Sequence, residues 1–89
     1  MHAIWKYPFP DPTGGTFNMP GDAQILDVQM QNGTPCIWAL VKIDRPKVSR
    51  TFCVIGTGHS IEDISRLGYI GTFQMMNGAL VWHVFESTT

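Results

Sequence analysis

The sequence predicts a mainly β, single-domain protein. We expect a small antiparallel β-sandwich or partly open barrel of five to seven strands, with at most one short helix near residues 60–67. Three observations support this class. The 89 residues suit one domain, spanning 1–89. Six prolines and nine glycines are spread along the chain and divide it into short apolar runs. Two of these breaks are Asn-Gly pairs, the strongest short signal for a β-hairpin.

The individual elements follow from these breaks. Prolines at positions 8, 10 and 12 end the first strand, and Gly14-Gly15 is predicted to be a turn. The one helical pattern begins at Ser60 as a cap and stops at Gly68, with apolar residues at spacing three between them. The predicted strands cover residues 4–9, 16–19, 24–31, 36–43, 48–55, 68–75 and 79–86.

The first Asn-Gly pair, Asn32-Gly33, predicts a specific register. A two-residue turn places Gln31 opposite Thr34 and Met30 opposite Pro35. Because Pro35 has no N–H group, that end of its strand should be a local edge. The same register predicts a core stripe made of Leu26, Val28, Met30, Ile37, Ala39 and Val41.

The second pair, Asn77-Gly78, places Phe73 opposite Trp82 and Thr72 opposite His83, with a hydrogen bond expected between Thr72 and His83. One face of this hairpin is apolar and aromatic, as a core face should be. It would be formed by Tyr69, Phe73, Met75, Leu80, Trp82 and Val84.

Composition excludes several classes of protein. A 44% apolar and 15% charged chain is typical of a folded protein, and a net charge of −1 gives no field that would attract an extended nucleic-acid tract. No apolar run is long enough to span a bilayer, and no secretion signal is visible at the N-terminus. We therefore expect a cytoplasmic protein without membrane attachment, in which Cys36 and Cys53 are reduced thiols.

The segment from Gly56 to His59 is the first candidate ligand-binding site. A glycine-rich loop after a strand can hold an anion through its backbone N–H groups. Its candidate residues are Gly56, Thr57, Gly58 and His59, with Arg45 and Arg50 supplying positive charge. The alternative is that the two glycines only form a sharp turn or bulge out of the strand.

Catalytic and metal sites are not predicted. His59, His83 and Cys53 are the groups that could transfer a proton or attack a substrate, but no pattern joins a nucleophile, an orienting partner and an oxyanion site. Three histidines without an i,i+4 pair make a poor metal template. We expect no catalytic residues, no metal and no cofactor.

The first strand carries the candidate interaction surface. Trp5, Tyr7 and Phe9 alternate along it and share one side. That side could belong to the core. If the strand lies at an edge, part of it could instead form a dimer seam or a protein interface.

Several phrases together resemble a family of short, uncharacterised phage and prophage proteins. They include residues 4–8 (IWKYP), 23–29 (AQILDVQ), 55–59 (IGTGH), 69–73 (YIGTF) and 81–86 (VWHVFE). The resemblance covers nearly the whole chain and implies a bacterial or viral origin, but it carries no known chemistry.

The function expected from these observations is a non-enzymatic binding module acting by protein–protein interaction, with an accessory role or inhibition of host defence suggested by the resemblance. Thin cores and sheet edges also make a homo-oligomer a candidate state. The alternative function is binding of a small ligand, a nucleotide or nucleotide-derived signal, at the loop of residues 56–59.

Overall fold

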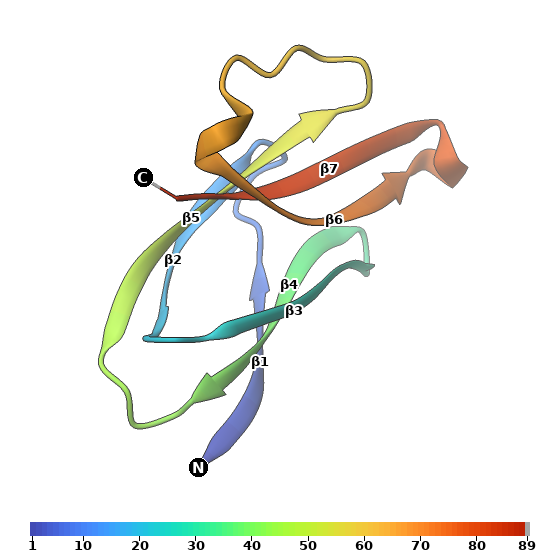
Figure 1. The fold of residues 1–89 in the computed structure, drawn as a ribbon. Helices are drawn as coiled ribbons and strands as arrows, with labels where there is room; N and C mark the ends of the chain where they lie inside the picture. Colours follow the sequence, from blue (N-terminus) through green and yellow to red (C-terminus); the bar gives the residue numbers. More distant parts are fainter. Residues whose placement is uncertain (89) are drawn as a thin grey trace.

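A computed structural model, which describes residues 1–88, shows seven strands in two antiparallel sheets (Figure 1). This confirms the predicted class, and the two sheets do not close into a barrel. The three-stranded sheet has the order β1 (His2–Pro8), β4 (Thr34–Lys42), β3 (Gln24–Gln31). The four-stranded sheet has the order β2 (Gly14–Pro20), β5 (Lys47–Gly56), β7 (Leu80–Ser87), β6 (Leu67–Met75).

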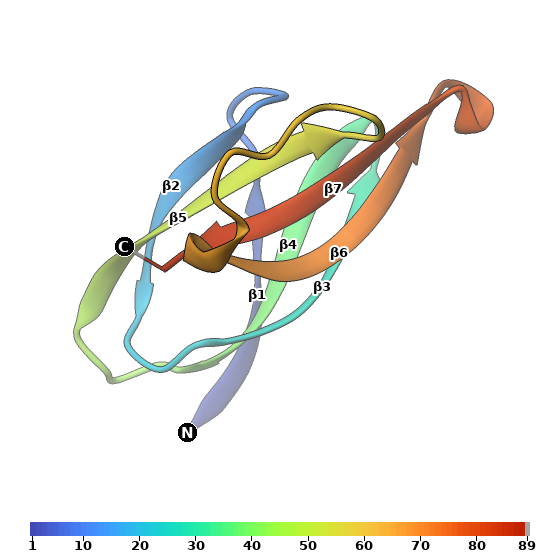
Figure 2. The same ribbon diagram turned by 45° about the horizontal axis from the view of Figure 1, so that its top comes forward.

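The core lies between the two sheets, which are stacked as two layers in Figure 2. Strand residues alternate between the two faces of a sheet, so every second apolar side chain points inward. The largest fully buried side chains come from both layers: Met19, Val28, Ile37, Val41, Phe52 and Val84. Ile4 and Lys6 are exposed on the outer side of β1.

The register of the first hairpin is confirmed. Gln31 pairs with Thr34 and Met30 with Pro35, and both turn residues take positive φ, 50° at Asn32 and 84° at Gly33. The prediction that Leu26 belongs to the core is wrong. A β-bulge between Ile25 and Asp27 shifts the alternation there, so Leu26 is 45% exposed.

The register of the second hairpin is confirmed as well, with Phe73 opposite Trp82 and Thr72 opposite His83. Two members of its predicted apolar face are exposed instead. Tyr69 is 60% exposed because the ladder shifts between Tyr69 and Gly71, and Leu80 is 40% exposed because it begins its strand beside the turn.

Two local predictions are corrected by the structure. Gly14 and Gly15 are the first residues of β2, and the turn precedes them, where the Asp11 carboxylate accepts a 2.8 Å hydrogen bond from the Thr13 N–H. The predicted helix is reduced to a 3₁₀ turn, Ile64–Arg66. Its cap is Asp63 rather than Ser60, because the Asp63 carboxylate accepts the hydrogen bond from the Ser65 N–H.

The two sheets approach each other along both sides of the sandwich. On one side β3 packs against β6, where a Cβ added to Gly71 would lie 2.8 Å from Val28 Cγ1. On the other side the Phe17 ring of β2 contacts Tyr7, with ring centroids 5.5 Å apart. Within residues 1–88 the structure contains no helix that is long and apolar enough to cross a membrane.

Candidate functional site

The loop that follows β5 forms one candidate site. The chain turns back on itself at Gly56, where the His59 N–H donates to the Gly56 carbonyl at 3.1 Å and the Thr57 N–H donates to the Val81 carbonyl at 3.2 Å. A Cβ on Gly56 would lie only 3.0 Å from ring atoms of both His59 and Trp82. Glycine at this position therefore lets the His59 ring meet the edge of Trp82, with centroids 6.3 Å apart.

A chain of hydrogen-bonded side chains runs from this loop across β7 to β6. Thr57 Oγ1 lies 2.7 Å from His83 Nε2, and His83 Nδ1 lies 3.0 Å from Thr72 Oγ1. The Tyr69 hydroxyl in turn contacts Thr72 Oγ1 at 2.5 Å. We call these four residues the hydroxyl–imidazole chain. It confirms the expected contact between Thr72 and His83.

A cleft of about 320 Å³ lies beside this chain. Its polar wall comes from the loop, through Gly56, Thr57 and His59, and its apolar wall comes from residues 79–82 at the start of β7. The volume is at the lower end of the range of small-molecule sites, roughly 300–1,000 Å³.

A second hollow, the end cavity, has a volume of about 220 Å³ and lies where the β1–β2 and β3–β4 connections meet β6 and β7. Trp82 lines both hollows and so stands between them. The remaining wall of the end cavity is largely aromatic and proline-rich: Phe9, Pro10, Asp11, Pro12, Gly33, Thr34, Pro35, Phe73 and Met75.

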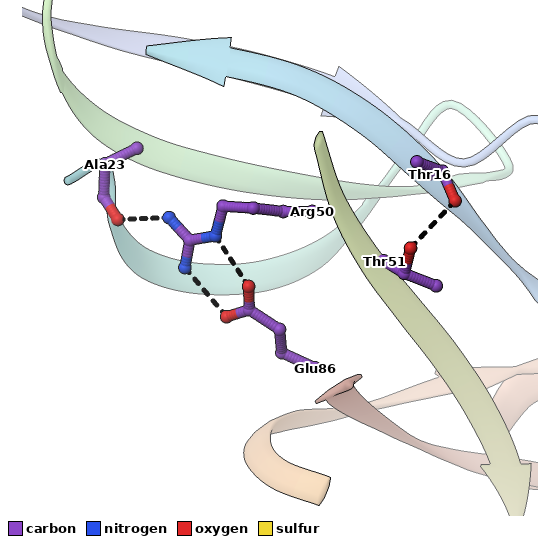
Figure 3. A network of polar contacts seen from close by, with 5 residues as sticks. All are labelled: Thr16, Ala23, Arg50, Thr51 and Glu86. Carbon is purple, nitrogen blue, oxygen red and sulfur yellow. Dashed lines mark hydrogen bonds and ion pairs between the residues drawn. The ribbon is translucent and has the colours of Figure 1, made fainter. Parts of the chain in front are cut away.

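The structure does not bring the two candidate arginines to the loop. Arg50 lies six residues before Gly56, about 20 Å away along an extended strand. Its guanidinium holds the Glu86 carboxylate with bonds of 2.6 and 2.7 Å and also donates to the Ala23 carbonyl (Figure 3). Hydrogen bonding to Glu86 raises the pKa of Arg50. The N–H donors of the Arg50 guanidinium are therefore used in hydrogen bonds within the fold and do not face the loop of residues 56–59.

Arg45 is also committed elsewhere. It lies in the connection between β4 and β5, at the opposite end of β5 from the loop of residues 56–59 (Figure 1). Its Nη1 atom lies 2.8 Å from the Asp22 carboxylate. The prediction that Arg45 and Arg50 supply positive charge to the loop of residues 56–59 is therefore wrong. Both guanidinium groups lie away from this loop and are paired with Asp22 and Glu86.

Trp5 and Tyr7 of β1, and Phe9 directly after it, lie on the inner side of the sheet. Phe9 is buried, and Trp5 and Tyr7 are half-buried and pack against the core. β1 is an edge strand, so its outward backbone groups, rather than these rings, face the open edge. Only Phe9 reaches a hollow, as part of the wall of the end cavity.

The two cysteines differ in burial. Cys36 is buried, and Cys53 is half-buried on β5. Burial raises the pKa of the Cys53 thiol, so the nucleophilic thiolate is disfavoured there.

Sequence reasoning missed three features of the site. The Thr57–His83 contact joins residues 26 positions apart, and only the pairing of β5 with β7 brings them together. Tyr69 joins the hydroxyl–imidazole chain because the β6 bulge turns it outward. Arg50 is paired with Glu86, and both side chains are half-buried at one end of the sandwich. The inward alternation of Phe73 and Met75 was the one signal that pointed to the end cavity.

Comparison with protein families finds one match, which covers residues 1–89: the model described as "Domain of unknown function (DUF7352)". A comparison with curated proteins finds no match, and neither does a comparison with solved structures.

Proposed function

This chain belongs to the DUF7352 family, and we propose that it is a non-enzymatic binding module that acts by protein–protein interaction. The observation that carries the proposal is the end cavity between the β1–β2 and β3–β4 connections. The partner of this chain would be a protein that inserts one large apolar side chain into the end cavity.

The size of the cavity favours a side chain over a free small molecule. About 220 Å³ is below the roughly 300–1,000 Å³ of small-molecule sites. Protein interfaces concentrate their binding energy in a few aromatic or apolar anchors that fill pockets of this kind. Phe9 and Phe73 are each 5% exposed, so the cavity has rigid aromatic walls.

The chemistry of the wall agrees with an apolar anchor. Asp11 is the one charged residue that lines the cavity, and its carboxylate already accepts hydrogen bonds from Thr13. Those bonds lower the pKa of Asp11 and keep it ionised at the rim. An uncharged side chain of the partner can therefore enter the end cavity without burying the charged Asp11 carboxylate unpaired.

The setting and assembly are part of the proposal. The resemblance to phage and prophage proteins favours a bacterial cytoplasm, and a host or phage protein as the partner. The outward edge of β1 is a regular strand without a bulge, which favours addition of a strand from a second copy in a homo-oligomer.

The test is a titration with N-acetyl-phenylalaninamide, which presents one aromatic side chain. Its binding is followed by NMR at the Met75 methyl group, which belongs to the cavity wall. Saturable shifts at Met75 are expected in the wild type. Thr34→Trp, which fills the cavity from its rim, should abolish them.

The matched control is Thr16→Trp, which adds the same ring to an exposed threonine of β2 outside the cavity. It should bind as the wild type does. The proposal fails if Met75 does not respond to the probe, or if Thr34→Trp responds as strongly as Thr16→Trp.

A further inference from the structure

The hydroxyl–imidazole chain has no acidic member. Tyr69, Thr72, His83 and Thr57 are joined by three contacts of 2.5–3.0 Å. The ion pairs found within residues 1–88 all use arginines, and none uses a histidine. The carboxylates of Glu86 and Asp63 are already bound, by Arg50 and by Ser65 with Arg66.

The chain can hold a proton on His83 without losing a hydrogen bond. A protonated imidazole donates from both nitrogens. Thr57 Oγ1 and Thr72 Oγ1 lie 2.7 and 3.0 Å away to accept these bonds. The Thr57 hydroxyl then donates to the Val81 carbonyl at 3.3 Å, and the Thr72 hydroxyl donates to Tyr69. A protonated His83 would therefore have an acceptor at each nitrogen, and no ion pair within residues 1–88 supplies it with a carboxylate.

The loop adds a free backbone donor next to Thr57. The N–H groups of Thr57 and His59 are used by the Val81 and Gly56 carbonyls, whereas the Gly58 N–H has no partner among residues 1–88. Gly58 has a φ of 87°, and nothing lies within 4 Å of the place where a Cβ would stand. The space on the Cβ side of Gly58 is therefore open, and Gly58 itself stands beside the residues that line the cleft.

We propose that the cleft beside residues 56–59 is a second binding site, which takes the phosphate group of a small phosphate ester. The phosphate would lie against the Gly58 N–H, the Thr57 hydroxyl and the His59 ring, with protonated His83 as the counter-charge behind Thr57. The Thr57 hydroxyl would then donate to the phosphate in place of its 3.3 Å bond to the Val81 carbonyl, while its oxygen still accepts from His83. The apolar wall from Ala79 to Trp82, with Leu80 40% exposed, would hold the ester's organic part. The site is distinct from the end cavity and does not need Arg45 or Arg50.

Within residues 1–88 no carboxylate stands opposite His83 in either ladder, and His59 shares the cleft with Thr57, the hydrogen-bond partner of His83. Thr72 of β6 and Ile55 of β5 stand opposite His83 in the two ladders, and Tyr69 lies beyond Thr72. Cys53 lies two residues from Ile55 on the same face of β5, and burial raises the pKa of its thiol. Since none of these groups is an anion at neutral pH, a bound phosphate would be the main charge near His83.

The experiment is an NMR titration of the full chain with inorganic phosphate and, separately, with adenosine monophosphate, at constant pH and with sodium chloride as the ionic-strength control. Saturable shifts are expected at the Gly58 N–H and the His83 ring. Thr57→Val and Thr72→Val each remove one hydroxyl from the chain and should weaken binding about tenfold.

The control variant is Thr51→Val, which removes a hydroxyl from the same sheet outside the chain, where Thr51 bonds to Thr16 at 3.0 Å (Figure 3). It should bind phosphate as the wild type does. Tighter binding of adenosine monophosphate than of inorganic phosphate supports the role of the apolar wall, and equal binding contradicts that role. The site is rejected if sodium chloride produces the same shifts, if the shifts map to Lys42, Arg45 and Lys47, or if Thr51→Val weakens binding as much as Thr57→Val.

Discussion

Arg50 and Glu86 form a two-bonded pair inside one end of the sandwich, with Nε and Nη2 of the guanidinium 2.6 and 2.7 Å from the two carboxylate oxygens. Both side chains are only 20% exposed. Arg50 also donates to the Ala23 carbonyl, which precedes β3 of the other sheet, so the pair links the two layers (Figure 3).

Loss of one partner should destabilise the fold. Glu86→Gln leaves the Arg50 guanidinium without its counter-charge, and we expect a loss of about 2 kcal/mol, or a Tm lower by about 10 °C. The double variant Arg50→Met/Glu86→Leu removes both charges, and it should recover most of that loss. Thermal unfolding of the three proteins measures this. If the double variant is less stable than Glu86→Gln, the Arg50–Glu86 pair stabilises the fold by more than the neutralisation of one charge by the other.

Gly71 sets how closely β6 approaches β3. An added Cβ would lie 2.8 Å from Val28 Cγ1, so Gly71→Ala should cost about 1–2 kcal/mol of unfolding free energy. Gly68→Ala is the matched control on the same strand, since its Cβ would meet nothing closer than 3.9 Å. Denaturant unfolding should also show that Val28→Ala and Gly71→Ala together cost less than the sum of the single changes. If the two losses of unfolding free energy are strictly additive, the contact between Gly71 and Val28 does not limit how closely β6 approaches β3.

Tyr7 carries a buried hydroxyl without a hydrogen-bond partner among the described residues. Burial raises the pKa of Tyr7, as expected for a phenol removed from water. Tyr7→Phe should therefore leave stability unchanged or raise it by about 1 kcal/mol. Tyr69→Phe, which removes an exposed and bonded hydroxyl, serves as the comparison in the same unfolding assay. A clear loss of stability in Tyr7→Phe would reveal a partner for this hydroxyl.

Asp11 should contribute to the pH dependence of stability. Hydrogen bonds from Thr13 lower its pKa in the folded protein. A lowered folded pKa stabilises the fold above the ordinary value of about 4, and that contribution disappears as the pH falls through the lowered value. The Tm difference between wild type and Asp11→Asn should thus be largest at neutral pH and shrink below about pH 4. Asp63, shifted in the same direction, is common to both proteins and cancels in the comparison. A Tm difference between the wild type and Asp11→Asn that does not change with pH would contradict the lowered pKa of Asp11 in the folded protein.

Both hairpins could be predicted from the sequence because the residues of the turn itself determine the turn and the register of the two strands beside it. Asn32-Gly33 supplies the positive φ angles of the first turn, and Asn77-Gly78 supplies two of the three in the second, where Met76 has a φ of 53° within the 3₁₀ turn Met76–Gly78. The registers of both ladders follow from these turns. The bulges at Leu26 and near Tyr69 could not be derived in this way. A bulge depends on how a strand meets the opposite sheet. No glycine or proline marks the one at Leu26, and Gly68 and Gly71, which flank the second, are compatible with a bulge without fixing its place.

The candidate site was predicted only in part for the same reason. Gly56, Thr57 and His59 do line a cleft and Gly58 does not, because a glycine-rich turn after a strand is a local feature whereas the exact lining depends on the fold. Arg50 was assigned to that loop by its charge alone, yet its partner Glu86 lies 36 residues away and is brought to it by the pairing of β5 with β7. The end cavity combines residues from three strands, β4, β6 and β7, with the β1–β2 and β3–β4 connections, so only the fold reveals it.

The binding proposal is tested most directly by selecting random peptides on the immobilised protein, with Thr34→Trp as the counter-selection. We expect peptides that share one large apolar residue, bind Thr16→Trp as well as the wild type, and lose binding to Thr34→Trp. Peptides that bind Thr34→Trp and the wild type equally, or a selection that enriches nothing, would contradict the binding proposal.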